Sequence, residues 1–102
     1  MQLLPNDIRA QLPPLYATES EEDPVVWCKF FTPWAHWTYY AIEFDGTDTF
    51  FGLVVGDDSE LGYFRLSELE QIEGPFGVTI ERDRYFTPTR LSIIRKEFVE
   101  RR

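Results

Sequence analysis

The sequence predicts an α+β fold: an antiparallel sheet of four to five strands, arranged as a meander and flanked by short helices from the N-terminus, the middle and the C-terminus. Four strand-like runs separated by turn residues lie between residues 25 and 66. Twelve of the 17 Phe, Trp and Tyr residues lie in the same stretch, so it can supply a substantial hydrophobic core. A chain of 102 residues closes about one core, which predicts a single domain over residues 1–102.

The strand-like runs follow one another along the chain. In the first run both alternating sets of side chains are mostly apolar, which indicates a central strand covered on both faces. Asp45-Gly46 directly follows the second run and predicts a hairpin, because Gly tolerates the positive φ that tight turns need. Neighbours in sequence tend to pair in space, so the runs form a meander. The predicted strands are Val25–Phe31, His36–Phe44, Thr49–Val55 and Leu61–Leu66, with Val78–Ile80 as a brief further strand.

A short helix is predicted before the sheet, within residues 3–12. Asn6 is its expected N-cap, and Pro13-Pro14 ends it because neither proline can donate a backbone hydrogen bond. Residues 15–24 then form a polar connector, which we expect to be a solvated loop. Its acidic residues are Glu19, Glu21, Glu22 and Asp23.

Two more short helices are predicted after the strands. Residues 67–70, Ser-Glu-Leu-Glu, fit a capping box, in which the Ser hydroxyl and the second Glu satisfy the first turn of a helix that Gly74-Pro75 ends. Thr87 is the expected N-cap of the last helix, with Pro88 at its first position. Apolar residues recur at helical spacing on this helix and should dock on the sheet; they are Leu91, Ile94 and Phe98.

The net charge of −8 is unevenly distributed along the chain. Residues 1–89 hold 16 acidic and 5 basic residues, whereas residues 90–102 hold 5 basic and 2 acidic ones. An acidic body argues against direct nucleic-acid binding, because phosphates require a broad basic surface. The basic tail, which includes Arg101 and Arg102, suits the last turns of a helix, where cations complement the helix dipole.

Cysteine content and hydropathy argue against disulfide-stabilised, zinc-binding and membrane-spanning classes of protein. Cys28 is the only cysteine, which argues against a disulfide framework or a Cys-rich zinc site and predicts a small buried side chain. No apolar run approaches the roughly 20 residues needed to span a bilayer, so we expect no membrane association. The N-terminal residues lack the pattern of a signal peptide, and we expect a cytoplasmic protein.

Catalytic and cofactor motifs are missing from the sequence. The six glycines form neither a dinucleotide-binding run nor a P-loop, so no cofactor is predicted. His36 is the only histidine, which argues against a multi-histidine metal site and weakens any Ser-His-Asp proposal. His36 and Glu43 are seven positions apart in one predicted strand and would point to opposite faces unless a bulge intervenes. We therefore predict no catalytic residue and no metal ligand.

One group of residues has the composition of a binding pocket or of an interaction surface. Aromatic rings beside a few charges can line a ligand site, although ordinary sheet faces share this composition. The charges of residues 81–84 alternate in sign, which predicts two salt-bridging faces in an extended segment. The candidate residues are Trp34, His36, Trp37, Glu81, Arg82 and Asp83.

Many short segments along the chain also fit one family pattern in the right order. Together they resemble the bacterial family called domain of unknown function twenty-nine fifty-eight. The segments span residues 3–5, 12–19, 29–34, 37–41, 51–54, 60–64, 66–70, 74–77, 80–83 and 85–88, and include Lys29-Phe30-Phe31-Thr32-Pro33-Trp34 and Gly74-Pro75-Phe76-Gly77. The resemblance covers nearly the whole chain.

The resemblance implies a context but no chemistry. Members of that family look like small cytoplasmic proteins carried on conjugative plasmids, integrative elements and phages, often near antirestriction genes. The family brings no established activity and no catalytic residues. Longer members carry an insertion between the second and third strands, where Glu43–Asp48 forms a tight hairpin in this chain.

These observations leave several functions open. We expect an accessory protein of a plasmid, integrative element or phage that binds another protein, with an anti-defence or antirestriction role among the options. In one version the acidic surface mimics DNA and enters a basic groove of the partner. Neutralising the connector acids would test this version; they are Glu19, Glu21, Glu22 and Asp23. The alternative is a small-ligand-binding module or enzyme that uses the aromatic sheet face. A homodimer formed through an exposed sheet edge is compatible with either function.

Overall fold

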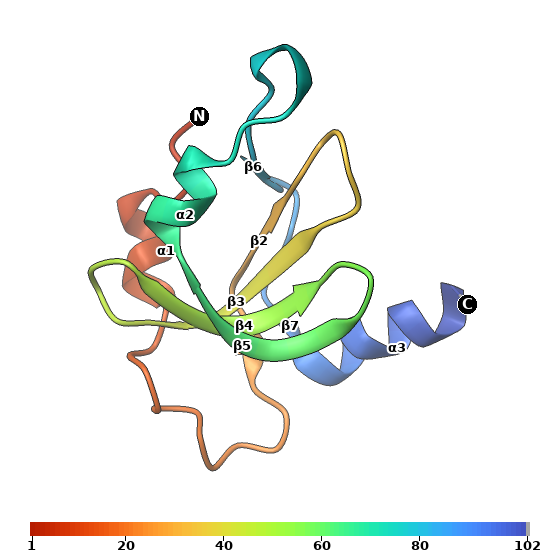
Figure 1. Ribbon diagram of the computed structural model, residues 1–102. Coiled ribbons are helices and arrows are strands. Elements are labelled where there is room, and N and C mark those ends of the chain that lie inside the picture. Colours follow the sequence, from red (N-terminus) through yellow and green to blue (C-terminus); the bar gives the residue numbers. More distant parts are fainter. Residues whose placement is uncertain (102) are drawn as a thin grey trace.

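The computed structural model describes residues 1–101 of the chain, with side chains for residues 1–98 (Figure 1). A five-stranded antiparallel sheet has the strand order β5-β4-β3-β2-β6, so β3 lies at its centre. This confirms the predicted α+β fold and the meander of its first strands. The strands are β2 Cys28–Phe31, β3 Thr38–Phe44, β4 Thr49–Val55, β5 Ser59–Arg65 and β6 Glu81–Arg82.

A second, two-stranded sheet and three α-helices complete the fold. β1 (Val25–Val26) pairs antiparallel with β7 (Thr89–Arg90) beside the main sheet. Figure 1 shows α1 and α2 together at one side of the strands and α3 at the other. The helices are α1 Asn6–Gln11, α2 Leu66–Gln71 and α3 Leu91–Arg101, and a short 3₁₀ turn, η1, covers Pro75–Gly77.

The two faces of the sheet bury separate hydrophobic clusters. On one face Phe44, Phe50 and Phe64 stack across three strands, with ring centroids 4.5 and 5.1 Å apart, under side chains from the N-terminal segment and α2. On the other face Tyr40 and Leu53 pack against α3. Leu91 and Ile94 of α3 are buried there and Phe98 is half-buried, as the helical spacing predicted. Both ends of the chain therefore pack on the sheet, on opposite faces.

The predicted first strand is divided in two. Residues 25–26 pair with β7, whereas residues 28–31 pair with β3 and β6. Trp27 lies between them and donates its backbone N–H to the Ala41 carbonyl (2.9 Å). Cys28 is buried, and this burial raises the pKa of its thiol to about 12.

The other strand boundaries shift by a few residues from those predicted. β3 begins at Thr38, so His36 and Trp37 belong to the preceding turn, and β5 runs from Ser59 to Arg65. The strand predicted at Val78–Ile80 is wrong in position, because the segment pairs with β2 only at residues 81–82. Only an isolated bridge from Thr79 to Glu73 precedes it. The hairpin at Asp45-Gly46 is confirmed, with Gly46 at φ +89°.

The helix starts were predicted incorrectly, because remote residues replace the local caps. α2 makes no capping box; instead Asp48, in the β3–β4 hairpin, accepts hydrogen bonds from the Ser67 N–H (2.8 Å) and hydroxyl (2.7 Å). Asp23 accepts the same pair of bonds from Ser92 in α3 (2.8 and 2.7 Å). Both bonds from Ser92 lower the pKa of Asp23, and the bond from the Ser92 hydroxyl has the larger effect.

The remaining cap predictions fail for related reasons. Thr87 and Pro88 precede β7 rather than open α3, which begins at Leu91. Asn6 is already inside α1, and its position as N-cap is taken by Pro5, which offers no side-chain cap. α2 ends at Gln71, before the predicted stop at Gly74-Pro75. In the basic tail, Arg101 and Arg102 have side chains outside the described part of the structure.

The connector between α1 and the sheet is more ordered than a solvated loop. Glu19, Glu21 and Glu22 are exposed, as expected. Asp23, however, is committed to capping α3, and the backbone N–H groups of Tyr16 and Thr18 bond to a strand carboxylate described below. Only part of the acidic run is therefore available to a partner.

Candidate functional site

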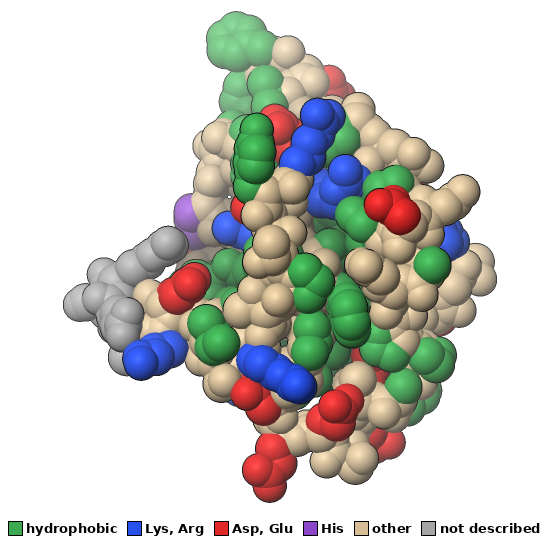
Figure 2. Space-filling view, turned by 180° about the vertical axis from the view of Figure 1, so that it is seen from behind, with side chains coloured by type: hydrophobic (Ala, Val, Ile, Leu, Met, Phe, Trp, Pro, Cys, Tyr) green, Lys and Arg blue, Asp and Glu red, His purple; other side chains and the backbone are tan. Residues whose placement is uncertain are grey.

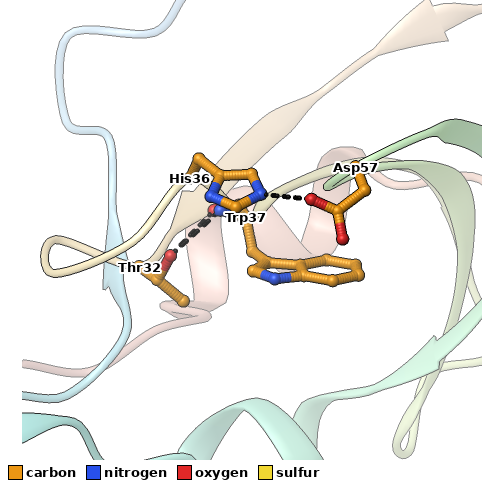
Figure 3. Close-up of polar contacts among 4 residues, drawn as sticks. All are labelled: Thr32, His36, Trp37 and Asp57. Carbon is orange, nitrogen blue, oxygen red and sulfur yellow. Dashed lines mark hydrogen bonds and ion pairs between the residues drawn. The ribbon is translucent and has the colours of Figure 1, made fainter.

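The turn between β2 and β3 is held by Thr32 (Figure 3). The buried Thr32 hydroxyl accepts the backbone N–H of Trp37 (3.1 Å) and donates to the Trp37 carbonyl (3.3 Å). The Thr32 backbone N–H also donates to that carbonyl (3.0 Å). These three bonds between Thr32 and Trp37 fix the backbone of the turn at Trp37.

The ring of Trp37 rests on the turn between β4 and β5. A Cβ atom at Gly56 would lie 2.5 Å from Cζ3 of Trp37, so only glycine allows the indole to approach this backbone so closely. In Figure 3 the indole extends toward the turn that carries Asp57. The tryptophan therefore has a fixed position even though it is exposed to solvent.

His36 and Asp57 form the most conspicuous polar pair of this region. His36 Nε2 lies 2.9 Å from Asp57 Oδ1, but the two side chains are 66% and 87% exposed. A catalytic dyad needs a nucleophile or a reacting group beside it. The Thr32 hydroxyl, drawn in Figure 3, is already bonded to the Trp37 backbone. The pair has the geometry of a surface contact rather than of an acid–base site.

Five of the six residues predicted from the sequence line one open groove of about 620 Å³, which we call the Trp37 groove. It lies at the β6 edge of the sheet, between the β2–β3 turn and residues 81–85. The predicted residues that line it are His36, Trp37, Glu81, Arg82 and Asp83; its other lining residues include Met1, Lys29 and Tyr85.

Trp34 lies outside this groove. Its ring is half-buried against the hydrophobic cluster beneath α2, and a Cβ atom at Gly74 would clash with it. It lines a neighbouring hollow of about 350 Å³ together with Tyr39 and Ile72, and Trp37 lines both this hollow and the Trp37 groove. The turn sends Trp34 and His36 to different sides, which their closeness in sequence could not show.

The charged residues of the Trp37 groove do not form the two salt-bridging faces that their alternating signs predicted. Arg82 donates to the backbone carbonyls of Gln2 (2.9 Å) and Leu3 (3.0 Å), and so ties the N-terminal segment to the sheet edge. Asp83 faces Lys29 at 3.8 Å and accepts the Tyr85 N–H at 2.9 Å. Among the described residues the segment thus makes one salt bridge and one anchor to backbone, not two salt-bridging faces.

The groove presents aromatic side chains and charges of both signs to solvent. Tyr85 is 94% exposed, and Trp37 and Met1 are also exposed. On the face shown in Figure 2, hydrophobic side chains lie exposed beside Lys and Arg side chains, with the single His at its left edge.

Sequence reasoning missed a second groove, of about 370 Å³, which we call the Tyr63 groove. It lies between the connector, α3 and the side of the sheet formed by β3, β4 and β5. Its apolar walls include Phe51, Leu61, Tyr63 and Leu91, and its rim includes Glu19, Glu21, Glu22 and Arg95.

A buried carboxylate builds this groove. The pairing of β3 with β4 shifts between Ala41 and Glu43, so a β-bulge interrupts the alternation of side chains. Glu43, only 3% exposed, accepts the N–H of Tyr16 (2.8 Å) and both the N–H (2.9 Å) and hydroxyl (2.5 Å) of Thr18. The connector is thereby fastened over the sheet.

Tyr16 is held in an unusual conformation above the groove. Its φ of +71° lies in the left-handed region, which costs a non-glycine residue free energy. Its hydroxyl shares a hydrogen bond with that of Tyr63, and this bond, ahead of partial desolvation and the nearby charge of Glu43, raises the pKa of Tyr63. The sequence signal for this arrangement is one charge, Glu43, inside an otherwise apolar strand.

The bulge that would let His36 and Glu43 cooperate is present, yet the two residues remain apart. His36 lines the Trp37 groove and Glu43 lines the Tyr63 groove. Among residues 1–98, whose side chains the structure describes, no group of three or more His, Cys, Asp or Glu side chains is placed to hold a metal ion. No described helix is both long and apolar enough to cross a membrane.

Comparison with known families matches residues 3–97 to the family described as "Protein of unknown function (DUF2958)". The chain belongs to the DUF2958 family. Neither the curated proteins nor the solved structures include a match. The DUF2958 match includes every residue that lines the two grooves except Met1, so both grooves are features of the family domain in this chain.

Proposed function

We propose that this DUF2958 protein acts by binding another protein through the Trp37 groove, as an accessory factor of a plasmid, integrative element or phage. The mobile-element setting rests on the family resemblance. The binding role rests on the groove itself, which displays Trp37, Tyr85 and Arg84 together at one edge of the sheet.

The residue types of the groove carry this proposal. Trp, Tyr and Arg are the residues that most often supply the binding energy of protein interfaces. Tyr85 is almost fully exposed and makes no described side-chain contact, so its hydrophobic ring gains burial only when a partner covers it. The fixed position of Trp37 lowers the entropy lost on binding.

An enzymatic role is less well supported by the same groove. Its only histidine pairs with an exposed carboxylate, and the hydroxyl of Thr32 is bonded to the Trp37 backbone. Cys28, the one thiol, is buried and its pKa is raised to about 12 by desolvation, so it is a poor nucleophile. The open shape of the groove also suits a protein surface better than a small ligand, which is usually enclosed.

The test is an affinity capture from a bacterial lysate, read by mass spectrometry, with the wild-type protein, Tyr85→Ser and Ile93→Ser. Ile93 is an exposed apolar residue on α3 and serves as the matched control. We expect a protein that the wild type and Ile93→Ser recover equally and that Tyr85→Ser recovers at about a tenth of that level.

Two results would contradict the proposal. A partner recovered equally by Tyr85→Ser would place the contact elsewhere on the surface. Absence of any specifically enriched protein, at both low and high salt, would favour the alternative of a small-ligand module.

A further inference from the structure

The edge strand β5 has an exposed backbone edge. It is the terminal strand of the main sheet and pairs with β4 alone among the described strands. Its seven residues, Ser59–Arg65, pair without a register shift and include neither proline nor lysine. Proteins usually protect such edges with a bulge, a proline or an inward charge. β5 has none of these three devices, although it carries two exposed charges, Glu60 and Arg65. Among the described residues no further backbone group bonds to its outer edge, so that edge can pair with another strand.

The Tyr63 groove opens beside this edge. Leu61 and Tyr63 project from β5 on the face that carries Leu53 and Phe51, their register partners on β4. Both are exposed, and the Tyr63 side of the edge is therefore lined by apolar surface. A strand added next to β5 would direct every second side chain toward that surface, since side chains alternate along a strand.

The rim of the groove is strongly acidic. Glu19, Glu21 and Glu22 are exposed around it, and among the side chains that the structure describes Arg95 is the only basic one that lines it. Figure 2 shows Asp and Glu side chains gathered at the lower end of the molecule, where Figure 1 places the connector. Aromatic walls with a carboxylate rim favour lysine and arginine side chains, whose stems bury against the rings while their charges meet the carboxylates.

We infer that β5 accepts an extended basic segment of another protein, which adds as a sixth strand and places alternate Lys or Arg side chains in the Tyr63 groove. Main-chain hydrogen bonds to a free sheet edge supply affinity, and the groove supplies the preference for basic residues.

This inference is independent of the proposed function. The Trp37 groove lies at the β6 edge of the sheet, and β5 is the opposite edge. The two surfaces share no lining residue, so each can fail its test while the other passes.

The experiment uses a labelled peptide of about seven residues that alternates valine with lysine or arginine, and measures its binding to the full-length protein by fluorescence anisotropy. One comparison peptide carries glutamate in place of the basic residues. A second keeps the basic side chains but is N-methylated at alternate amides, so that it cannot pair with a strand edge. Hydrogen exchange then locates the protected amides.

The matched protein variants remove the same charge in different places. Glu19→Gln with Glu22→Gln neutralises the groove rim, and Asp7→Asn with Glu70→Gln neutralises two exposed acids elsewhere. We expect the basic peptide to bind, the rim variant to bind it about fivefold or more weakly, and the control variant to bind it as the wild type does. The amides of β5 should become protected, and N-methylation should abolish binding.

Several outcomes would overturn the inference. Equal binding of the N-methylated peptide would exclude strand addition. If both variants bound the basic peptide equally weakly, the net charge of the protein and not the groove rim would account for the effect. Failure of the basic peptide to bind would also contradict it. Self-association that protects β5 without peptide would show that a second copy of the chain occupies the edge instead.

Discussion

Glu43 shows how one residue can organise distant parts of this chain. It is the only charged residue of β3, and its burial is tolerated because three donors from the connector satisfy its oxygens. The same bonds hold Tyr16 at a positive φ, beside Tyr63. The strand, the connector and the Tyr63 groove therefore depend on a single carboxylate.

Replacing Glu43 should destabilise the protein strongly. Glu43→Ala leaves the N–H groups of Tyr16 and Thr18 without an acceptor in a half-buried site, which costs about 2–4 kcal/mol in the free energy of unfolding. Glu43→Gln keeps one acceptor oxygen and should cost less. Urea unfolding measures both. Glu60→Gln on the exposed part of β5 is the control and should change stability by less than about 0.5 kcal/mol; equal effects at positions 43 and 60 would refute this role.

Cys28 should react slowly with thiol reagents while the protein is folded. Burial raises the pKa of its thiol from 9.0 to about 12, so at pH 8 the native protein holds almost no thiolate. Above about pH 9 the unfolded chain ionises while the native thiol stays neutral, and the contribution of this group to stability is lost as the pH rises toward 12. Labelling at pH 8 with and without urea tests this. A native rate close to the unfolded rate would contradict it.

At the level of elements, the two later helices begin in the same way. Each starts with a Leu-Ser pair, and in each the serine is bonded to an aspartate from a distant loop, Asp48 for α2 and Asp23 for α3. The N–H of Leu66 bonds to the Asp48 carbonyl (2.8 Å) and that of Leu91 to the Pro24 carbonyl (2.9 Å). The capping rules applied to the sequence assigned these caps to Ser67 and Thr87, because such rules consider only neighbouring residues and not a distant aspartate.

Two glycines that face each other across β4 and β5 should differ sharply in their tolerance of alanine. A Cβ atom on Gly52 would collide with the carbonyl oxygen of Tyr40 in β3, whereas one on Gly62 would meet nothing within 4 Å. Gly52→Ala must therefore separate the central strands and should cost about 3 kcal/mol or more. Gly62→Ala should be neutral or slightly stabilising, because alanine loses less backbone entropy. Thermal unfolding of the pair is the measurement, and equal melting temperatures would be the contrary result.

At the level of the whole molecule, alternation and turn residues predicted the sheet because hairpins are local. The break at Trp27, the bulge at Glu43 and the pairing of β1 with β7 were not predictable in this way, because each depends on contacts between distant segments.

The candidate site was predicted in part for the same reason. His36 and Trp37 share one turn, and Glu81, Arg82 and Asp83 share one edge segment, so their grouping needed only that β6 pair with β2. Trp34 lies in a neighbouring hollow that it shares with Trp37, because the turn directs Trp34 and His36 to different sides. The Tyr63 groove needs the connector to cross β3, and the sequence offered only the lone charge of Glu43 as a sign of it.

Site-specific photo-crosslinking can show whether the Trp37 groove contacts a partner protein. A photoreactive phenylalanine derivative replaces Tyr85 in one variant and Ile93 in another, and both are irradiated in living bacterial cells. We expect one discrete heavier species from position 85 and none from position 93. No crosslinked species at position 85, or the same species from both positions, would show that the groove does not make this contact.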